Sequence, residues 1–144
     1  MKRIIVYIFM FFLLVSCKST LKIINFCPYV FEKADILFTK DLSENVLVLS
    51  CDIKNLSDRC IKFIKIDLSV KDENDSSVFI GDNIYLKIQT LIFPEETKNI
   101  KINLDEYIIE NIGTNCKIDG IFVSEVIFDD GQKWMDIFGR YSIY

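Results

Sequence analysis

The chain of 144 residues contains no histidine, only two prolines and only five glycines. Without histidine, a Ser-His-Asp or Cys-His catalytic arrangement cannot be built within one chain, and a metal site has no imidazole ligand. With so little proline and glycine, no segment reads as a flexible linker between domains. The sequence therefore excludes several enzyme classes and favours one compact domain.

Basic residues are also scarce, with 17 Lys and Arg against 21 Asp and Glu and a formal charge of −4. The phosphate backbone of a nucleic acid repels such a chain, so we expect no nucleic-acid partner. Apolar side chains make up 51% of the residues and aromatic ones 13%, which suffices for a hydrophobic core. We therefore expect the chain to fold.

The first seventeen residues have the layout of a secretory signal. Lys2 and Arg3 precede an uninterrupted apolar run over residues 4–15, and Ser16 precedes Cys17. As a helix this run is about 18 Å long, whereas a stable membrane span needs ~20 apolar residues. A cleaved signal is therefore favoured over a retained transmembrane anchor.

The tetrad Leu14-Val15-Ser16-Cys17 resembles the lipobox of bacterial lipoproteins. The resemblance implies cleavage after residue 16, acylation of Cys17 with fatty acids such as palmitate, and attachment to a membrane of the bacterial cell envelope, facing the periplasm or the cell surface. An ordinary signal peptide with a cysteine near its cleavage site is the alternative. The chain then divides into a signal peptide over 1–16, a lipidated tether over 17–33 and a folded domain over 34–144.

Removal of residues 1–16 changes the formal charge from −4 to −6, because Lys2 and Arg3 are lost. Anionic headgroups repel such a domain, so the acyl chains and not a basic patch are expected to hold it at the membrane. Residues 21–31 are already largely apolar, so we expect the folded part to lie close to the membrane.

Alternation of apolar and polar side chains dominates the rest of the sequence and predicts β-strands at about 47–53, 60–71, 84–92, 97–104, 117–128 and 133–143. Acidic residues at 105 and 106 and a glycine at 113 favour a short helix over 105–112. Asp130-Gly131 predicts a hairpin between the last two strands. About seven strands with frequent turns predict an all-β fold, an immunoglobulin-like antiparallel β-sandwich.

Two stretches of this pattern are similar to known modules. Residues 46–58, with the turn Asn55-Leu56-Ser57-Asp58, resemble bacterial immunoglobulin-like modules of the FxLYD kind, and residues 126–134 resemble the Phe-x-Asp-Gly-x-x-Trp hairpin of related small envelope domains. The Phe-x-Leu-Tyr-Asp pattern itself is absent, because residues 66–70 read Ile-Asp-Leu-Ser-Val. The resemblance implies a fold and carries no catalytic residues.

Four cysteines remain after Cys17, namely Cys27, Cys51, Cys60 and Cys116. If a pair is bridged, Cys51 and Cys60 are the candidates, because they flank one turn and both face inward by alternation. The alternative is buried thiols that serve as small core residues. We expect no zinc site, because the chain has no C-x-x-C pair.

The acidic turn at residues 72–77 has Asp72, Asn74 and Ser76 at alternate positions, as calcium loops do. However, Ser77 takes the place of the required glycine and Asn83 that of the bidentate glutamate. A solvated turn is therefore favoured, and we expect neither a metal nor a cofactor.

The last predicted strand is rich in aromatic residues, which are expected to cover the core. The alternative is that Trp134, Tyr141 and Tyr144 face outward and form a surface contact patch. Two functions remain open. The favoured one is a non-catalytic envelope module that binds another envelope protein or has a structural role, and the alternative is a carrier or sensor of a small apolar ligand. Because a small sandwich fills its interior with its own side chains, binding is expected at the surface.

Overall fold

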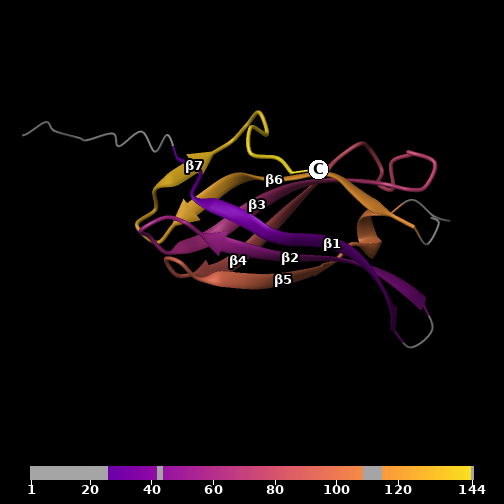
Figure 1. Ribbon diagram of the computed structural model, residues 1–144, viewed down its shortest axis with the longest axis horizontal. Helices are drawn as coiled ribbons and strands as arrows, with labels where there is room; N and C mark the ends of the chain where they lie inside the picture. Colours follow the sequence, from indigo (N-terminus) through magenta and orange to yellow (C-terminus); the bar gives the residue numbers. More distant parts are fainter. Residues whose placement is uncertain (1–25, 42–43, 109–114, 144) are drawn as a thin grey trace, which may run out of the picture.

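The computed structural model describes residues 26–41, 44–108 and 115–143. Within these residues, seven strands form two antiparallel sheets that pack face to face (Figure 1). One sheet holds, in spatial order, β1 (Tyr29–Asp41), β2 (Glu44–Asn55) and β5 (Thr97–Asn103). The other holds β4 (Ile84–Ile92), β3 (Ile61–Lys71), β6 (Lys117–Phe128) and β7 (Lys133–Met135). The predicted antiparallel β-sandwich of about seven strands is confirmed.

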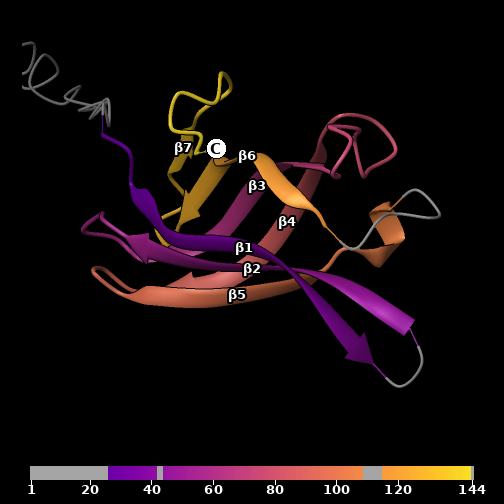
Figure 2. The same cartoon turned by 45° about the vertical axis from the view of Figure 1, so that its right-hand side comes forward.

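The strand order is that of an immunoglobulin-like sandwich. Strands 1, 2 and 5 share one sheet and strands 3, 6 and 7 the other, while the fourth strand pairs with the third. The two sheets therefore end at β1 and β7 on one long side of the molecule and at β5 and β4 on the other, as Figure 2 shows. We call the first of these sides the β1/β7 edge.

The core lies between the sheets and is formed by the apolar positions of the predicted alternation. Every second residue is buried over 47–55 of β2, and over 64–70 of β3 every second residue contributes an apolar side chain to the core. The two rows belong to one core cluster: Leu47, Leu49, Cys51 and Ile53 from one sheet, and Ile64, Ile66, Leu68 and Val70 from the other. Polar and charged side chains between them point outward. Phe79 and Phe128 contribute the largest fully buried side chains of the core.

The structure departs from the predicted boundaries at three places. β1 begins at Tyr29, so the folded part starts before residue 34 and overlaps the expected tether. The expected helix over 105–112 is only a 3-10 turn, Asp105–Tyr107, and Ile108 is already extended; residues 109–112 lie outside the described part. The last strand ends at Met135 instead of 143, after which Ile143 alone returns to pair with Ile121.

No disulfide joins the four cysteines that the structure describes. The candidate pair Cys51 and Cys60 is buried but not bridged. Because β2 continues to Asn55, Cys51 lies four residues inside a strand of one sheet, about 13 Å from its end. Cys60 directly precedes β3 of the other sheet. The separation exceeds the reach of a disulfide, which requires Cα atoms less than ~7 Å apart.

Candidate functional site

An exposed apolar loop follows β7 at the β1/β7 edge. We call residues 136–143 the edge loop. Ile137 is 72% exposed and Phe138 79%, and three further apolar side chains in or beside the loop are also exposed, those of Met135, Tyr141 and Ile143. Figures 1 and 2 both show the loop (yellow) projecting from the β1/β7 edge. A contiguous set of large exposed apolar side chains typically marks a contact surface.

A buried carboxylate holds this loop in shape. Asp136 is only 5% exposed, and its two oxygens accept the backbone N–H groups of Phe138 at 3.3 Å and of Tyr141 at 3.1 Å. The Asp136 N–H donates to the Ser124 carbonyl of β6 at 3.0 Å. The loop is thus a hydrogen-bonded turn fixed to the sheet, and its apolar side chains are displayed outward by a defined backbone.

Glycine is required at one position of the edge loop. Gly139 has a φ of +61°, in the left-handed region, and a Cβ there would approach the Phe122 ring to 3.2 Å. The Gly139 carbonyl accepts the Ser142 N–H at 3.1 Å, and Ile143 then exchanges two backbone hydrogen bonds with Ile121. The loop is therefore anchored at both of its ends.

Tyr29 at the start of β1 supports the base of the loop. Its ring contacts the Trp134 ring edge-on at 5.8 Å and the Phe31 ring at 5.5 Å. Its hydroxyl accepts the backbone N–H of Val123 in β6 at 2.9 Å. Val123 lies between residues 125–127 of β6, which pair with β7, and Ile121, which pairs with Ile143. Burial raises the pKa of Tyr29 well above its usual value, so the hydroxyl stays neutral.

The three aromatic residues predicted for a contact patch have different positions. Trp134 is only 7% exposed and belongs to the core, which is the favoured of the two roles expected for it and not the alternative of a surface contact; β7 turns its indole inward against Tyr29. Tyr141 is exposed, and its ring lies 5.8 Å from that of Trp134. Tyr144 lies outside the described residues. The sequence analysis placed Ile137 and Phe138 in an expected strand, in which neighbouring side chains face opposite ways, so the exposure of both was not predicted.

A small hollow of about 250 Å³ lies beneath the loop on the outer face of the β4-β3-β6-β7 sheet. Asp67 in it is 6% exposed and accepts a hydrogen bond from Asn83 at 3.1 Å, and burial raises its pKa. Asp119 is paired with Lys71 at 3.1 Å. Both carboxylates thus have protein partners, which gives the hollow a structural role in seating the loop.

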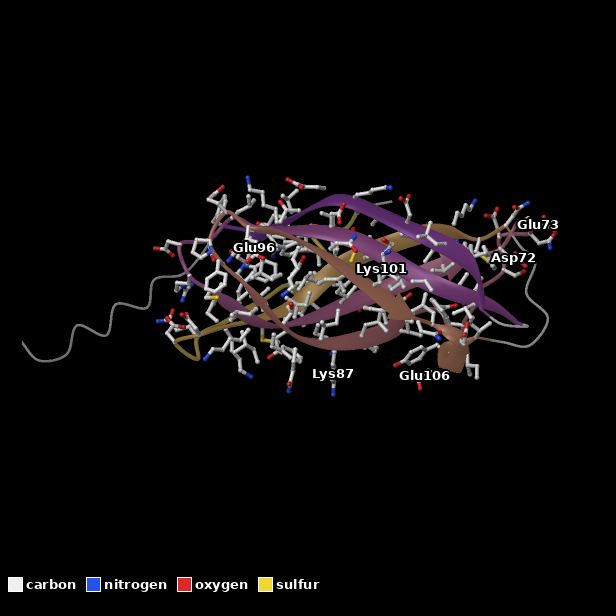
Figure 3. The ribbon with its side chains drawn as sticks, turned by 90° about the horizontal axis from the view of Figure 1, so that it is seen from below. Asp72, Glu73, Lys87, Glu96, Lys101 and Glu106 are labelled. Atoms are coloured by element: carbon white, nitrogen blue, oxygen red, sulfur yellow. The ribbon has the colours of Figure 1, made fainter. Side chains whose placement is uncertain are left out.

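The turns at residues 72–77 and 129–132 lie at opposite ends of the sandwich, because the β3–β6 register places Lys71 beside Lys117 and Ile61 beside Phe128. Figure 3 shows Asp72 and Glu73 at the end opposite Glu96. Asp72 accepts the N–H groups of Asn74 and Ser76 at 2.8 and 2.9 Å, which lowers its pKa. The predicted solvated turn is therefore observed, and the two turns cannot form one site.

A more open hollow of about 400 Å³ lies at the end with the acidic turn. Its lining combines Ile36 and Phe38 of β1 with Cys116 and charged side chains of Asp72, Glu73 and Lys117.

Among the described residues, no three metal-ligating side chains gather in one place. No helix of the described part is long and apolar enough to cross a bilayer.

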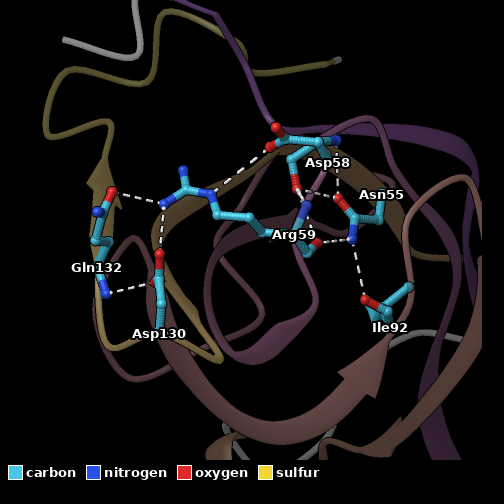
Figure 4. Close-up of polar contacts among 7 residues, drawn as sticks. Asn55, Asp58, Arg59, Ile92, Asp130 and Gln132 are labelled. Carbon is cyan, nitrogen blue, oxygen red and sulfur yellow. Dashed lines mark hydrogen bonds and ion pairs between the residues drawn. The ribbon is translucent and has the colours of Figure 1, made fainter. Parts of the chain in front are cut away.

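The turn between β2 and β3 forms a buried polar network (Figure 4). Asn55 is fully buried and donates to the carbonyls of Arg59 at 2.7 Å and Ile92 at 3.0 Å, while its side-chain oxygen accepts both the N–H and the hydroxyl of Ser57. Arg59 extends to Gln132 at 2.6 Å in the β6–β7 turn. The Asn-x-Ser sequence of this turn therefore joins three loops at one end of the sandwich, which is a structural role.

Cys17, the predicted lipidation site, lies outside the described residues, but the described chain begins beside the edge loop. Cys27 is half-buried at the start of the chain and donates to the Tyr29 carbonyl at 3.2 Å. Burial raises the pKa of its thiol, and the neighbouring Asp136 carboxylate adds to the increase. The N-terminal segment and the edge loop are therefore neighbours.

Comparison with known proteins supports the fold and goes no further. No protein-family profile matches the sequence, and no curated protein does. The structure is similar to a hypothetical protein from Peptoclostridium difficile 630, with a TM-score of 0.55 and 10% identity over 78% of this chain and 88% of the other. A Northeast Structural Genomics Consortium target aligns with a TM-score of 0.44 and 10% identity, over 74% of this chain and 79% of the other. The first likeness places the chain among β-sandwich proteins.

Proposed function

We propose that the protein is a lipid-anchored module of the bacterial cell envelope, acylated on Cys17 and facing the periplasm or the cell surface. The observation that carries the proposal is the order of features at the N-terminus: two basic residues, a short apolar run and the tetrad Leu14-Val15-Ser16-Cys17. The position of β1 adds support, since the sandwich begins at Tyr29, only twelve residues after Cys17.

The role we propose for the sandwich is contact with another envelope component without catalysis. The buried carboxylates of the described residues, Asp67 and Asp136, hold other parts of the chain, the first through Asn83 and the second through the edge loop. The edge loop in contrast offers exposed side chains on a fixed backbone, which suits binding.

A second candidate function is that of a carrier or sensor of a small apolar ligand. The observation that favours it is the hollow of about 400 Å³ beside Ile36, Phe38 and Cys116, which falls within the range of small-molecule sites. Its mouth is open and lined with charged residues, and the sandwich core is filled from both sheets by its own side chains. Surface contact is therefore the better supported proposal.

Mass spectrometry of the protein purified from its own host tests the anchor. Loss of residues 1–16 and added acyl mass on Cys17 are expected, and the Cys17→Ser variant should leave the membrane fraction and lack this mass. A retained Met1 or an unmodified Cys17 would reject the proposal. Native mass spectrometry of the same preparation separates the two roles, because a stoichiometric co-purifying lipid or metabolite would favour the carrier.

A further inference from the structure

The edge loop combines three features that together define one kind of partner. Its exposed side chains are large and apolar, its single charged exposed residue is the cation Arg140, and its only carboxylate, that of Asp136, is buried and engaged with the loop backbone. The domain as a whole carries an acidic excess. The loop is therefore a local exception, with apolar surface and no exposed anion.

The loop also lies where the chain leads toward its anchor. Cys27 and Asp136 are electrostatic neighbours, and Tyr29 packs on Trp134 at the base of the loop. Phe26, the first described residue, is itself 57% exposed. Figures 1 and 2 show the start of the described chain (indigo) and the edge loop (yellow) on the same side of the molecule, whereas β5 lies on the opposite side.

The length of the tether limits what can lie beside this edge. Phe26 lies nine positions after Cys17, and nine steps along the chain span about 30 Å when fully extended. An acylated Cys17 would hold the bilayer surface within that distance of the β1/β7 edge. Attachment through so short a tether gives an effective local concentration on the order of millimolar, so that a weak contact with the bilayer becomes populated.

We propose that the edge loop inserts into the surface of the bilayer that holds the lipidated Cys17, with Ile137 and Phe138 entering the headgroup–acyl boundary and Arg140 at the phosphate level. This inference rests on the proposed lipid anchor and specifies how the domain is oriented on the membrane. The β1/β7 edge faces the bilayer, and the opposite edge, formed by β5 and β4, faces away. Amphipathic elements bind bilayers in this manner, through apolar side chains placed at the interface.

The rigidity of the loop favours its insertion into the bilayer surface. Asp136 and Gly139 fix the backbone of the loop, in which Ile137 and Phe138 are 72% and 79% exposed, and the loop has no need to order on binding. A preorganised surface loses little conformational entropy on contact. The buried Asp136 carboxylate stays with its N–H donors and does not have to enter the lipid.

Fluorescence quenching by brominated lipids tests the orientation. The full chain, processed and acylated by its host, is reconstituted into phosphatidylcholine liposomes with brominated acyl chains, as wild type and as the variants Phe138→Trp and Lys101→Trp. Lys101 is an exposed residue of β5, on the far edge, and Figure 3 shows its position. The native Trp134 is buried and supplies a common background in all three proteins.

We expect the tryptophan introduced at position 138 to be quenched and that at position 101 to be quenched no more than the wild-type background. Adding Ile137→Asp to the Phe138→Trp variant should lower the inserted population by on the order of tenfold or more. Adding Leu91→Asp, at an exposed apolar residue of β4, should leave the quenching unchanged. Circular dichroism confirms that each variant is folded.

The acyl mass on Cys17 is measured on the same preparation, which separates the two proposals. Acylated, liposome-bound protein in which the tryptophan at position 138 is unquenched would overturn the insertion and leave the anchor standing. Equal quenching at positions 101 and 138 would overturn it too, as would a detergent-solubilised dimer that shields position 138 from iodide, because a second copy would then cover the loop. Protein without acyl mass would overturn both proposals.

Discussion

The hydroxyl of Tyr29 offers a sharp test of how the β1/β7 edge is held together. It accepts the N–H of Val123 at 2.9 Å, and both residues are buried. The variant Tyr29→Phe keeps the ring contacts with Phe31 and Trp134 and removes only the acceptor. The perturbation is therefore one hydrogen bond between the two sheets.

The loss of stability in Tyr29→Phe can be worked out from the N–H of Val123, which would be buried without an acceptor. A buried donor without a partner costs about 1–3 kcal/mol, more than the net gain of an average hydrogen bond. For a domain of this size, 1 kcal/mol shifts the melting temperature by roughly 4–8 °C. We expect Tyr29→Phe to melt on the order of 10 °C below the wild type.

Urea unfolding followed by the fluorescence of Trp134 measures this cost, and Tyr85→Phe is the matched control. Tyr85 is 56% exposed on β4, and its ring face, which contacts Lys65 at 4.5 Å, is kept by phenylalanine. The control should stay within about 0.5 kcal/mol of the wild type. If Tyr29→Phe is no less stable than Tyr85→Phe, the hydroxyl does not bridge the sheets and our account of the edge is wrong.

Three further predictions concern stability, pH and the loop. Burial raises the pKa of Cys51 from 9.0 to about 12, so between those pH values the unfolded chain releases a proton that the folded chain keeps. This thiol should therefore contribute about 1.4 kcal/mol to the stability that is lost from pH 8 to pH 10. In urea unfolding, Cys51→Ala should lose that much less than the wild type, and equal losses would contradict this. Asp136→Ala should accelerate hydrogen exchange at the amides of Phe138 and Tyr141, and unchanged rates would refute the role of the carboxylate. Asn55→Asp should destabilise the domain by several kcal/mol in urea unfolding, because it replaces two donors by an acceptor that faces two carbonyls, and a loss below about 1 kcal/mol would refute the network.

The central strands could be predicted from the sequence because their alternation is regular. The buried apolar rows of β2 over 47–53 and of β3 over 64–70 follow a period of two; only the start of β3, before Phe63, departs from it through a bulge. The turn residues were equally informative, since Gly131 adopts a φ of +80° in the hairpin that Asp130-Gly131 predicts. Propensity and tertiary packing agree at these positions.

The edge could not be predicted in the same way, because β-bulges change the parity of its strands. In β1 the register shifts between Phe31 and Lys33. The side chains that face the core therefore stand at odd-numbered positions before Glu32 and at even-numbered positions after it. The alternation therefore changes at Glu32, three residues after β1 begins at Tyr29. In β6 the residue Ser124 is skipped in the pairing with β3, with a similar effect. A bulge depends on which strands pair and in which register, and a single sequence does not show this pairing.

The edge loop escaped prediction for a different reason. Residues 133–143 alternate poorly but are rich in β-formers, and local propensity favours continuing the strand past Met135. The strand ends there because the Asp136 carboxylate captures the N–H groups of Phe138 and Tyr141 and curls the backbone into a turn. An aspartate followed by a glycine three residues later predicts such a turn only weakly. The turn forms here because the Asp136 carboxylate is buried and accepts the N–H groups of the loop.

The backbone at this edge also limits which partners the surface can take. β7 has only three residues, and beyond it the β6 backbone is already paired: the Val123 N–H with Tyr29, the Ser124 carbonyl with the Asp136 N–H, and Ile121 with Ile143. A partner that adds a strand needs a row of unpaired backbone groups, and these groups of β6 are already engaged within the chain. What remains accessible is the side-chain surface of the edge loop, which is apolar. Recognition at the loop therefore depends on burial of Ile137 and Phe138 and not on strand pairing, as a bilayer surface requires.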